Sequence, residues 1–369
     1  MKPNEASGLN PASTLLPNLP QNSEIVVIRL RSLGDLVLET PAIAALHAFR
    51  PDLRISVLVE PRFAAVFEGN PAIAEVIFSR PSVLETTLEL RKRRFTVVFN
   101  QHGGPGSAVL TGFSGSPWRV GWTQHQYSFL LNVRVPEVKE FYGVPAVHTV
   151  EHRMSQFYWT GLPRGPIPSA QVYPQAAVVE STVGILGEKG IAPGEPYAVL
   201  QPGARLPEMR WPLAKFAEIA GWLRKAHGIA TVVNLGAQET EALPEVQRAL
   251  QEHAAIPNAP LDLRELIALI AGSRIFIGND SGPAHLAAAL RRPSVVIFSL
   301  TDPIQWRPWH APHRIVQTGA SFDHPRGDKA IVTNNPRSIS SIDIAEVQSA
   351  CEGLLSAKRM EDNTHPKKW

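Results

Sequence analysis

The sequence has little or nothing of several features that would define a class of protein. Its 369 residues contain one cysteine, Cys351, which excludes an intramolecular disulfide and a metal site built from clustered cysteines. No apolar run approaches the roughly 20 residues that a membrane-spanning helix needs. The net charge is only +3, and no basic stripe is interleaved with aromatic residues, so we expect no nucleic-acid partner. We therefore expect a globular, cytoplasmic protein.

Several short motifs of nucleotide and hydrolase chemistry are also absent. There is no GxxxxGK[ST] loop and no strict GxGxxG turn, so neither nucleotide hydrolysis nor a dinucleotide cofactor is favoured. No GxSxG elbow supports a serine hydrolase. Because no Asp-x-Asp pair is present to hold a nucleotide-bound divalent ion, we expect neither a cofactor nor a metal ion.

What the sequence does contain is a long alternation of strand-like and helix-like segments. Apolar, β-branched runs occupy residues 25–30, 55–59, 95–100, 197–201, 230–235, 274–277 and 294–298. Helical patterns separate them, which predicts an α/β protein with parallel sheets covered on both faces. The length suits two domains, and proline-rich residues 162–174 read as their connection. We expect residues 1–22 to be a disordered tail and residues 101–150 to be irregular.

A polar turn follows the first strand and opens a predicted helix over residues 36–49. It contains Ser32, Gly34 and Asp35, and Arg29 and Arg31 precede it. Asp35 could simply cap the helix, where a carboxylate meets the positive end of the dipole. The alternative is a general base at the carboxyl edge of a parallel sheet, with the two arginines holding an anionic substrate. The extra charge favours the second interpretation.

A second turn follows the strand at 274–277. It contains, in order, Gly278, Asn279, Asp280, Ser281, Gly282, Pro283 and His285. Gly282 and Pro283 suit a tight turn at the start of a helix, whose exposed N–H groups bind phosphate well. Ser281 could donate to a phosphate, Asp280 could accept from sugar hydroxyls, and His285 could donate to a phosphate oxygen.

Other loops at the same predicted edge carry further candidates. Gly203, Arg205 and Arg210 follow the strand at 197–201, where they could contact the phosphates or the transferred group of a donor. Glu239 could accept from a ribose or only cap a helix. Trp306 and Trp309 could line a pocket for a base or sugar, or could plug a loop. We interpret the basic run at residues 91–94 as a solvated helix end rather than an anion site.

In these motifs the chain resembles glycosyltransferase family 9, the ADP-heptose:lipopolysaccharide heptosyltransferases. The matching segments are IRLRSLGDLVLETPAIAAL, VLVEPRFAAVFEGNPAIAEVI, QPGARLPEMRWPLAKFAEIA, VVNLGAQETE and FIGNDSGPAHLAAALRRPSVVIFSLTDP. They occur in family order across residues 24–303. The resemblance implies a GT-B fold, in which two Rossmann-like domains with parallel sheets face a central cleft.

The resemblance also implies a domain plan. It comprises a tail over residues 1–22, an acceptor-binding domain at 23–165, a linker and helix at 166–195, a nucleotide-sugar donor-binding domain at 196–340, a C-terminal helix at 341–358 that crosses back to the first domain, and a polar tail at 359–369.

The implied activity is metal-independent transfer of a heptose from ADP-heptose to the inner core of lipopolysaccharide, with inversion. Asp35 matches the proposed catalytic base of the family, and the turn from Asp280 to His285 matches its donor-diphosphate site. Arg29 matches a basic residue near the acceptor, together with Arg31, Ser32 and Gly34. The acceptor is a lipid-linked saccharide, so we expect weak peripheral contact with the cytoplasmic face of the inner membrane.

One position departs from the family pattern. Met209 stands where the family commonly has a lysine expected to contact the phosphate or sugar of the donor. Arg205 or Arg210 could take over that contact, or the donor sugar could differ. Two other functions therefore stay open, a sugar-nucleotide 2-epimerase of the same fold and a non-catalytic nucleotide-sugar-binding homologue.

Overall fold

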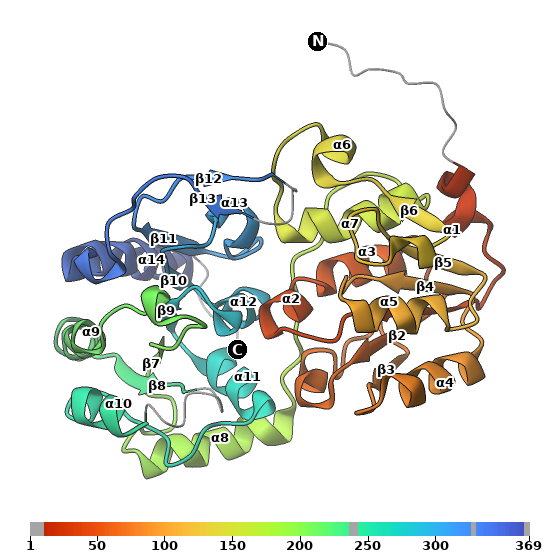
Figure 1. Ribbon diagram of the computed structural model, residues 1–369. Coiled ribbons are helices and arrows are strands. Elements are labelled where there is room, and N and C mark those ends of the chain that lie inside the picture. The colour runs from red at the N-terminus through yellow and green to blue at the C-terminus, as the bar shows by residue number, and fades with distance from the viewer. Residues whose placement is uncertain (1–10, 236–242, 326–329, 365–369) are drawn as a thin grey trace.

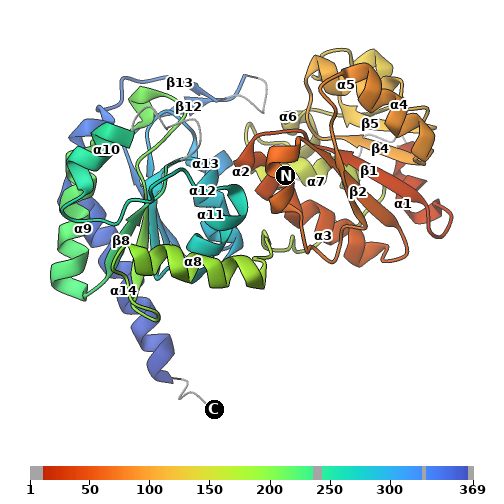
Figure 2. The same ribbon diagram turned by 90° about the horizontal axis from the view of Figure 1, so that it is seen from below.

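Two parallel sheets, each covered by helices, form the body of the protein. The computed structural model describes residues 11–235, 243–325 and 330–364. The first sheet has the strand order β3-β2-β1-β4-β5-β6, and the second has the order β11-β10-β9-β7-β8. The sheets lie in separate halves of the molecule, and α2 and α12 meet between them (Figures 1 and 2).

The strands of the first sheet come from short, mostly apolar runs, and burial is most complete at the centre of the sheet. They are β1 (Glu24–Ile28), β2 (Arg54–Val59), β3 (Glu75–Phe78), β4 (Val97–Asn100), β5 (Trp118–Trp122) and β6 (Val133–Val135). Ile25 of β1 pairs with Ile55 of β2 on one side and with Val97 of β4 on the other. The strand order reverses between β1 and β4, and at such a point the loops after the strands diverge and leave room for a ligand.

Helices pack on both faces of this sheet because successive strand residues point in opposite directions. They are α2 (Leu33–Val37), α3 (Thr40–Phe49), the 3-10 helix η2 (Pro61–Val66), α4 (Val83–Arg93), α5 (Pro105–Gly112), the 3-10 helix η3 (Ser128–Leu130), α6 (Val138–Tyr142) and α7 (Thr149–Trp159). Val27 belongs to the core beneath α3 and α7, whereas Val26 belongs to the core beneath α4 and α5. The single helix expected over residues 36–49 is in fact two, α2 and α3.

The expectation that residues 101–150 are irregular is wrong. This segment contains α5, β5, β6 and α6, and its two strands extend the sheet beyond β4. Pro105 stands in the first turn of α5, where a missing N–H costs nothing. The strands are short, and Gly121 interrupts β5, so the sequence gives only a weak strand pattern there.

The disordered tail expected over residues 1–22 also needs correction, because residues 11–22 are ordered. They form the 3-10 helix η1 (Pro11–Thr14) and α1 (Leu15–Asn18). Leu16 is fully buried, and its N–H donates to the carbonyl of Thr160 at 2.8 Å. The Arg50 guanidinium donates to the carbonyls of Leu16 and Leu19. Burial of a few leucines therefore fixes a segment whose overall composition is polar. Residues 1–10 lie outside the described part.

An extended stretch leads from α7 to α8 (Ala176–Glu188) and into the second sheet. The strands of this sheet are β7 (Tyr197–Gln201), β8 (Ala230–Val233), β9 (Ile275–Asn279), β10 (Ser294–Phe298) and β11 (His313–Gln317). The other elements are η4 (Pro207–Met209), α9 (Leu213–His227), α10 (Leu243–Leu250), α11 (Leu263–Gly272), α12 (Gly282–Ala289), α13 (Pro303–Trp306), η6 (Ile339–Ser341), the β12–β13 pair (Phe322–Asp323 and Ile331–Val332) and α14 (Ile344–Thr364).

The last helix, α14, does not cross back to the first domain over the residues whose side chains are described. It packs on β11, β10 and α9 of the second domain. Val347, Cys351 and Leu354 of α14 are buried in the same core as Ile277 and Val295. This apolar face matches the second sheet, and Figure 1 shows α14 on the side of that sheet remote from the first domain.

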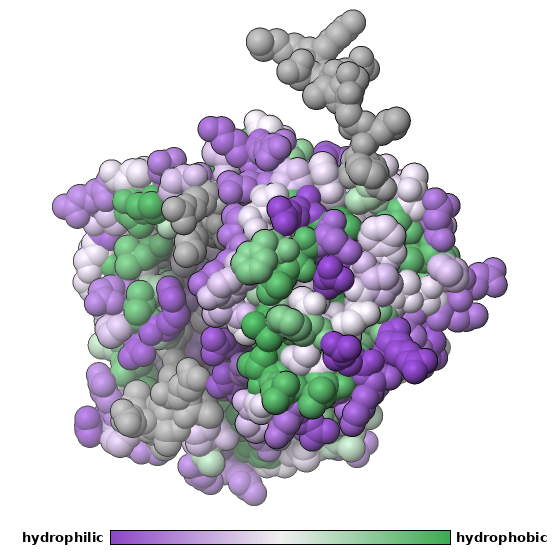
Figure 3. All heavy atoms as spheres, turned by 45° about the vertical axis from the view of Figure 1, so that its right-hand side comes forward, coloured by the Kyte–Doolittle hydropathy of each residue, from purple (hydrophilic) through white to green (hydrophobic). Residues whose placement is uncertain are grey.

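The surface of the first domain carries several exposed large apolar side chains. In Figure 3 they gather on the face that contains α4 and α5. Leu84, Phe113 and Phe129 are each more than half exposed. Within the described ranges, none of the helices is both long enough and apolar enough to span a bilayer.

Candidate active site

Asp35 lies in the first turn of α2, directly beyond the carboxyl end of β1. Ser32, not Asp35, occupies the N-cap position of this helix. The Ser32 hydroxyl donates to Oδ2 of Asp35 at 2.9 Å. The Asp35 side chain retains 15% exposure. A simple capping role therefore does not describe this carboxylate, because it pairs with the side chains of Ser32, Arg29 and Arg153.

Two buried arginines converge on the other oxygen of Asp35. Oδ1 lies 2.5 Å from Nη2 of Arg29 and 2.8 Å from Nη2 of Arg153. Both guanidinium groups also donate through Nη1 to the carbonyl of Gln101, at 2.6 and 3.0 Å. This shared acceptor fixes the two arginines side by side, so the carboxylate is held from two directions.

The electrostatics of this cluster separate two neighbouring carboxyl groups. Burial raises the pKa of Asp35, but Arg29 and Arg153 outweigh it and lower the pKa to about 2. Glu39, which is fully buried, lies with Oε2 at 3.7 Å from Nε of Arg153 and accepts no hydrogen bond among the described residues. Burial raises its pKa to about 7, against the opposing effect of the arginines. Asp35 is therefore ionised at neutral pH, and Glu39 titrates there.

The turn that carries Asp35 packs directly against α12 of the second domain. A Cβ atom built on Gly34 would lie 2.6 Å from Cδ2 of His285, and one built on Gly282 would lie 2.8 Å from Cβ of Leu33. Both glycines are thus required for the close approach of the helices. The two turns singled out in the sequence, one from each half of the chain, meet in space.

The start of α12 has the features of an anion site. Pro283 lies in its first turn, and the side chain of the N-cap residue Ser281 donates to the carbonyl of Asn279 instead of capping the helix. The first N–H groups of α12 are therefore not capped by that side chain. Burial lowers the pKa of His285 to about 4, so its imidazole is neutral at pH 7 and can donate through one nitrogen.

Asp280 and Asn279 are fixed in different ways beside this helix. Oδ2 of Asp280 accepts from the Thr301 hydroxyl at 2.5 Å, and burial raises the pKa of Asp280 to about 6. The Asn279 amide donates to the carbonyl of Pro202 and accepts from the N–H of Trp211. Asn279 thus ties the loop after β7 to β9, while Asp280 remains beside the helix start.

The loop after β7 places the other predicted donor residues around this turn. Gly203 is buried, whereas Arg205 and Arg210 are exposed. Nε of Arg210 donates to the carbonyl of Ala204 at 3.0 Å. Met209 is 5% exposed, so its side chain belongs to the interior. Glu239 lies outside the described residues.

The two tryptophans left open in the sequence lie at the contact between the domains. Trp309 is buried with Leu38 and Val150, and its indole N–H donates to the carbonyl of Pro168 at 2.9 Å. Trp306 lies with its ring centroid 6.2 Å from that of His285. Trp309 therefore fills the interface, and Trp306 lies next to the donor turn.

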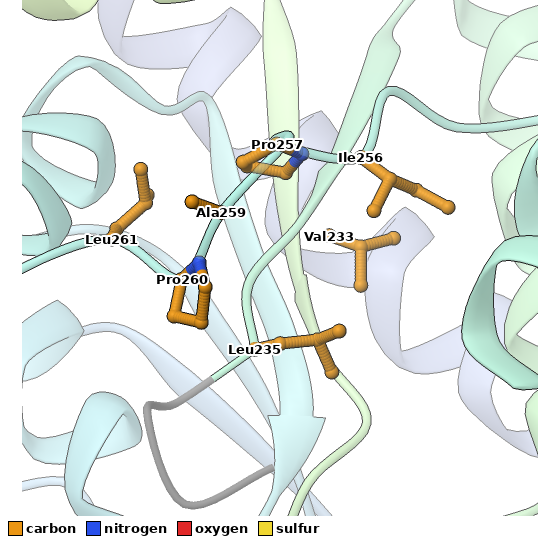
Figure 4. Close-up of a pocket in the computed structure, with 7 residues that line it drawn as sticks. All are labelled: Val233, Leu235, Ile256, Pro257, Ala259, Pro260 and Leu261. Carbon is orange, nitrogen blue, oxygen red and sulfur yellow. The ribbon is translucent and has the colours of Figure 1, made fainter. Parts of the chain in front are cut away.

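A small apolar pocket opens beyond the carboxyl end of β8. It is lined by Val233, Leu235, Ile256, Pro257, Ala259, Pro260 and Leu261 (Figure 4). It lies on the same edge of the second sheet as the Asp280 turn, since β8 and β9 both flank β7 in parallel.

Sequence reasoning missed Arg153, Glu39 and His102 as parts of the site. Arg153 is 118 residues from Asp35, on α7, and no local motif announces it. Glu39 occupies an ordinary polar position between α2 and α3. His102 follows β4, where burial and the nearby arginines Arg29 and Arg31 lower its pKa to about 4. The only available signal was that Gln101 and His102 follow a buried strand at the same edge as Asp35.

Among the described residues, no three His, Cys, Asp or Glu side chains are grouped so that they could hold a metal ion.

The exposed side chain of Arg31 lies 3.9 Å from Glu60. It is thus the one of the two predicted acceptor arginines whose guanidinium is open to solvent, because Arg29 is committed to Asp35 and Gln101.

A family model described as glycosyltransferase family 9 (heptosyltransferase) matches residues 83–329. The chain belongs to glycosyltransferase family 9. Lipopolysaccharide heptosyltransferase 3 of Escherichia coli is 26% identical over 342 residues, which cover 88% of this chain and 97% of that protein. As a member of this family the chain is a glycosyltransferase.

Solved structures of the family share the fold of this glycosyltransferase. A family 9 glycosyl transferase from Veillonella parvula DSM 2008 superposes with a TM-score of 0.80 at 20% identity, covering 94% of this chain and 99% of that one. The ADP-heptose lps heptosyltransferase II of E. coli superposes with a TM-score of 0.74 at 24% identity, covering 91% and 99%. The fold is GT-B, as the sequence predicts.

Proposed function

We propose that this chain transfers a heptose from ADP-heptose to the inner core of lipopolysaccharide, with inversion at the anomeric carbon and without a metal ion. The single observation that carries the proposal is the meeting of the Asp35 turn with the start of α12. One domain supplies an ionised carboxylate, and the other supplies a helix start able to hold a diphosphate. Family membership and the E. coli relatives support the substrate class.

In the proposed reaction the acceptor hydroxyl attacks the anomeric carbon of the donor from the side opposite the diphosphate. The new C–O bond forms as the bond between that carbon and the phosphate oxygen breaks, and ADP leaves with the electron pair. The hydroxyl proton passes to Asp35. Oδ2 is the better placed oxygen, because it accepts only from Ser32, whereas Oδ1 faces both arginines.

The low pKa of Asp35 is compatible with this role. A carboxyl group with a pKa of about 2 is a weak base toward an ordinary hydroxyl. The hydroxyl becomes strongly acidic only as its oxygen bonds to the electron-poor anomeric carbon. Asp35 therefore takes the proton late, and the two arginines keep it ionised until that moment.

On the donor side, α12 stabilises the negative charge that develops on the departing diphosphate. Pro283 has no N–H and the N–H of Ala284 donates to the Ser281 carbonyl, so the N–H of Gly282 and the neutral His285 are the groups that can donate to phosphate oxygens. Asp280 can accept from hydroxyls of the heptose. Arg210, exposed beside buried Met209, is the candidate for the contact that a lysine commonly makes in the family.

The test is to compare Asp35→Asn with Glu140→Gln, a control that alters an exposed carboxylate of the same domain. Asp35→Asn is expected to lower kcat about a hundredfold or more, the scale of a missing general base, and to leave ADP binding by calorimetry unchanged. Glu140→Gln is expected to match the wild type. Near-normal turnover of Asp35→Asn would refute the assignment, and a strict metal requirement in EDTA-treated protein would refute metal independence.

The same assay separates the other functions. A 2-epimerase would consume the nucleotide sugar with no acceptor present. A non-catalytic homologue would bind ADP tightly and transfer nothing to any lipopolysaccharide core. The proposed transferase consumes donor only when the acceptor is present.

A further inference from the structure

One face of the first domain exposes large apolar side chains that no described element covers. We call it the α4–η3 face and define it by Val83, Leu84, Leu88, Phe113, Tyr127 and Phe129. Leu84 and Phe129 are 67% and 69% exposed, and Leu88 and Phe113 are 50% and 53% exposed. Single exposed apolar residues are ordinary, but a contiguous group of this size on one face marks an interaction surface.

The contacts beneath these side chains show that they form one surface. Helix α4 packs on α5, and α5 packs on η3. A Cβ atom built on Gly106 of α5 would lie 3.9 Å from Val83, and one built on Gly112 would lie 3.0 Å from Leu130. The rings of Tyr127 and Phe129 lie edge to face with centroids 6.0 Å apart. Figure 3, in which the first domain comes forward, shows hydrophobic side chains gathered together with hydrophilic ones beside them.

The charged rim of the face is predominantly basic. Residues 80–94 contain five arginines and lysines against two glutamates. Arg93 is paired with Glu75 and Glu89, whereas Arg91 and Lys92 are exposed at the end of α4. Cations beside exposed aliphatic and aromatic side chains match a surface that is negatively charged at its headgroups and apolar beneath them.

One end of the α4–η3 face lies near the edge of the first sheet that holds Asp35. Helix α4 follows β3 and α5 follows β4, so Val83 and Leu84 lie at the carboxyl edge of the first sheet. Phe113 follows the end of α5, where η3 packs, and the Leu130 carbonyl accepts from Nε of Arg119 near the start of β5, so this part of the face lies toward the opposite edge. The loop that leads to Tyr127 contains His125, whose ring would contact a Cβ atom on Gly103, next to His102. The face thus extends from the edge that holds Asp35 to the basic end of α4.

We propose that the α4–η3 face docks on the surface of a bilayer containing anionic phospholipids. Leu84, Leu88, Phe113 and Phe129 enter the headgroup region, and Arg91 and Lys92 contact lipid phosphates. The docked face lays the α4–α5 layer along the membrane, and its Val83–Leu84 end is the end at the carboxyl edge of the first sheet. The statement that this orientation serves a lipid-linked acceptor rests on the proposed function, but the docking itself does not.

The test measures flotation of the purified full-length protein with vesicles of phosphatidylglycerol and phosphatidylethanolamine, against vesicles of phosphatidylcholine. Binding is expected only with the anionic vesicles and is expected to weaken as salt is raised. The Arg91→Gln and Lys92→Gln double variant is expected to lower the partition coefficient about twenty-five-fold, since each basic residue near an anionic surface contributes about fivefold. The Leu84→Ser and Phe129→Ser double variant is also expected to float poorly.

Controls on the second domain are Lys225→Gln with Arg248→Gln for charge, and Ile331→Ser, 54% exposed, for apolar area. They are expected to bind vesicles as the wild type does. An equal loss of vesicle binding in the control and test variants would overturn the proposal. So would a wild-type protein that binds only the phosphatidylcholine vesicles. A dimer in sedimentation velocity that Phe129→Ser abolishes would assign the face to a second copy of the chain instead.

The outcome is independent of the proposed activity. Transfer to a delipidated core saccharide in solution should be unchanged in all these variants, because the altered residues lie outside the Asp35 cluster. If no transfer is found in any variant but flotation behaves as expected, the proposed function fails and the docking surface stands. If transfer is normal but the protein does not float with anionic vesicles, the docking surface fails and the proposed function stands.

Discussion

Replacing Glu39 with glutamine is expected to remove a pH dependence of stability that the buried cluster around Asp35 creates. The Glu39 side chain is fully buried, and the charged groups that face it are Arg29, Arg153 and Asp35. Burial dominates and raises its pKa from an ordinary 4.5 to about 7 in the folded protein. Glutamine keeps the shape of the side chain and can present its oxygen to Arg153, but it cannot ionise.

The sign follows from which state binds the proton. Between the unfolded pKa and the folded pKa of Glu39, the folded protein holds a proton that the unfolded chain has lost. Stability from this group is therefore fully present below about pH 4.5 and is lost as the pH rises through about 7. A pKa unit corresponds to about 1.4 kcal/mol, so the complete change is about 3 kcal/mol, of which about 2.5 kcal/mol falls between about pH 5 and pH 8.

The assay is urea unfolding of Glu39→Gln and the wild type, followed by tryptophan fluorescence at several pH values. The quantity of interest is the difference in free energy of unfolding between the two proteins at each pH. Asp280, with a pKa raised by burial to about 6, titrates in the same range, but it is common to both proteins and cancels. Relative to the wild type, Glu39→Gln should gain about 2.5 kcal/mol from about pH 5 to pH 8.

Glu140→Gln serves as the control, because that carboxylate is exposed on the same domain and should leave the difference flat. A flat difference for Glu39→Gln as well would refute the reasoning. It would mean that Glu39 is ionised in the folded protein over this whole pH range, with the cost of burying its charge offset by Arg153.

Three further substitutions test the architecture. Gly34→Ala places a methyl group 2.6 Å from the buried His285 ring and should impair both stability and transfer, whereas Gly184→Ala, which meets nothing within 4 Å in α8, should not. Trp309→Ala should cost about 3 kcal/mol or more in thermal unfolding by emptying the contact between the domains. Arg50→Ala should release the segment before β1 and expose it to limited proteolysis, measured as the rate of cleavage within residues 11–19.

The parts of the molecule that the sequence predicts correctly are those whose signals are local. The strand at residues 24–28 is an uninterrupted apolar run after its first residue, Glu24, and the turn after it contains a glycine and an acid where a parallel sheet presents its loops. The Asp280 turn is predicted by the same local signals, an apolar strand followed by a turn that contains glycine and an acid. Family motifs add the fold, because GT-B strands and turns are recognisable at low identity.

The parts that the sequence does not predict depend on tertiary contacts. Arg153 is one arginine in an ordinary amphipathic helix until α7 packs on α3 and β5 and brings it 2.8 Å from Asp35. Glu39 appears polar and therefore exposed, yet two arginines allow it to be buried. Leu16 stands in a polar segment, and its burial follows from a hydrogen bond to a carbonyl 144 residues away.

The tight contact between α2 and α12 places a constraint on how the reaction can proceed. Gly34 and Gly282 already lie so close to His285 and Leu33 that the helices leave no space for a sugar between them. The reacting sugar must therefore lie beside this contact, with Asp35 and the start of α12 as adjacent walls rather than opposite ones. Binding of a bulky donor then requires the domains to separate or to slide, and Trp309, buried at the same interface, is where such a motion must break contacts.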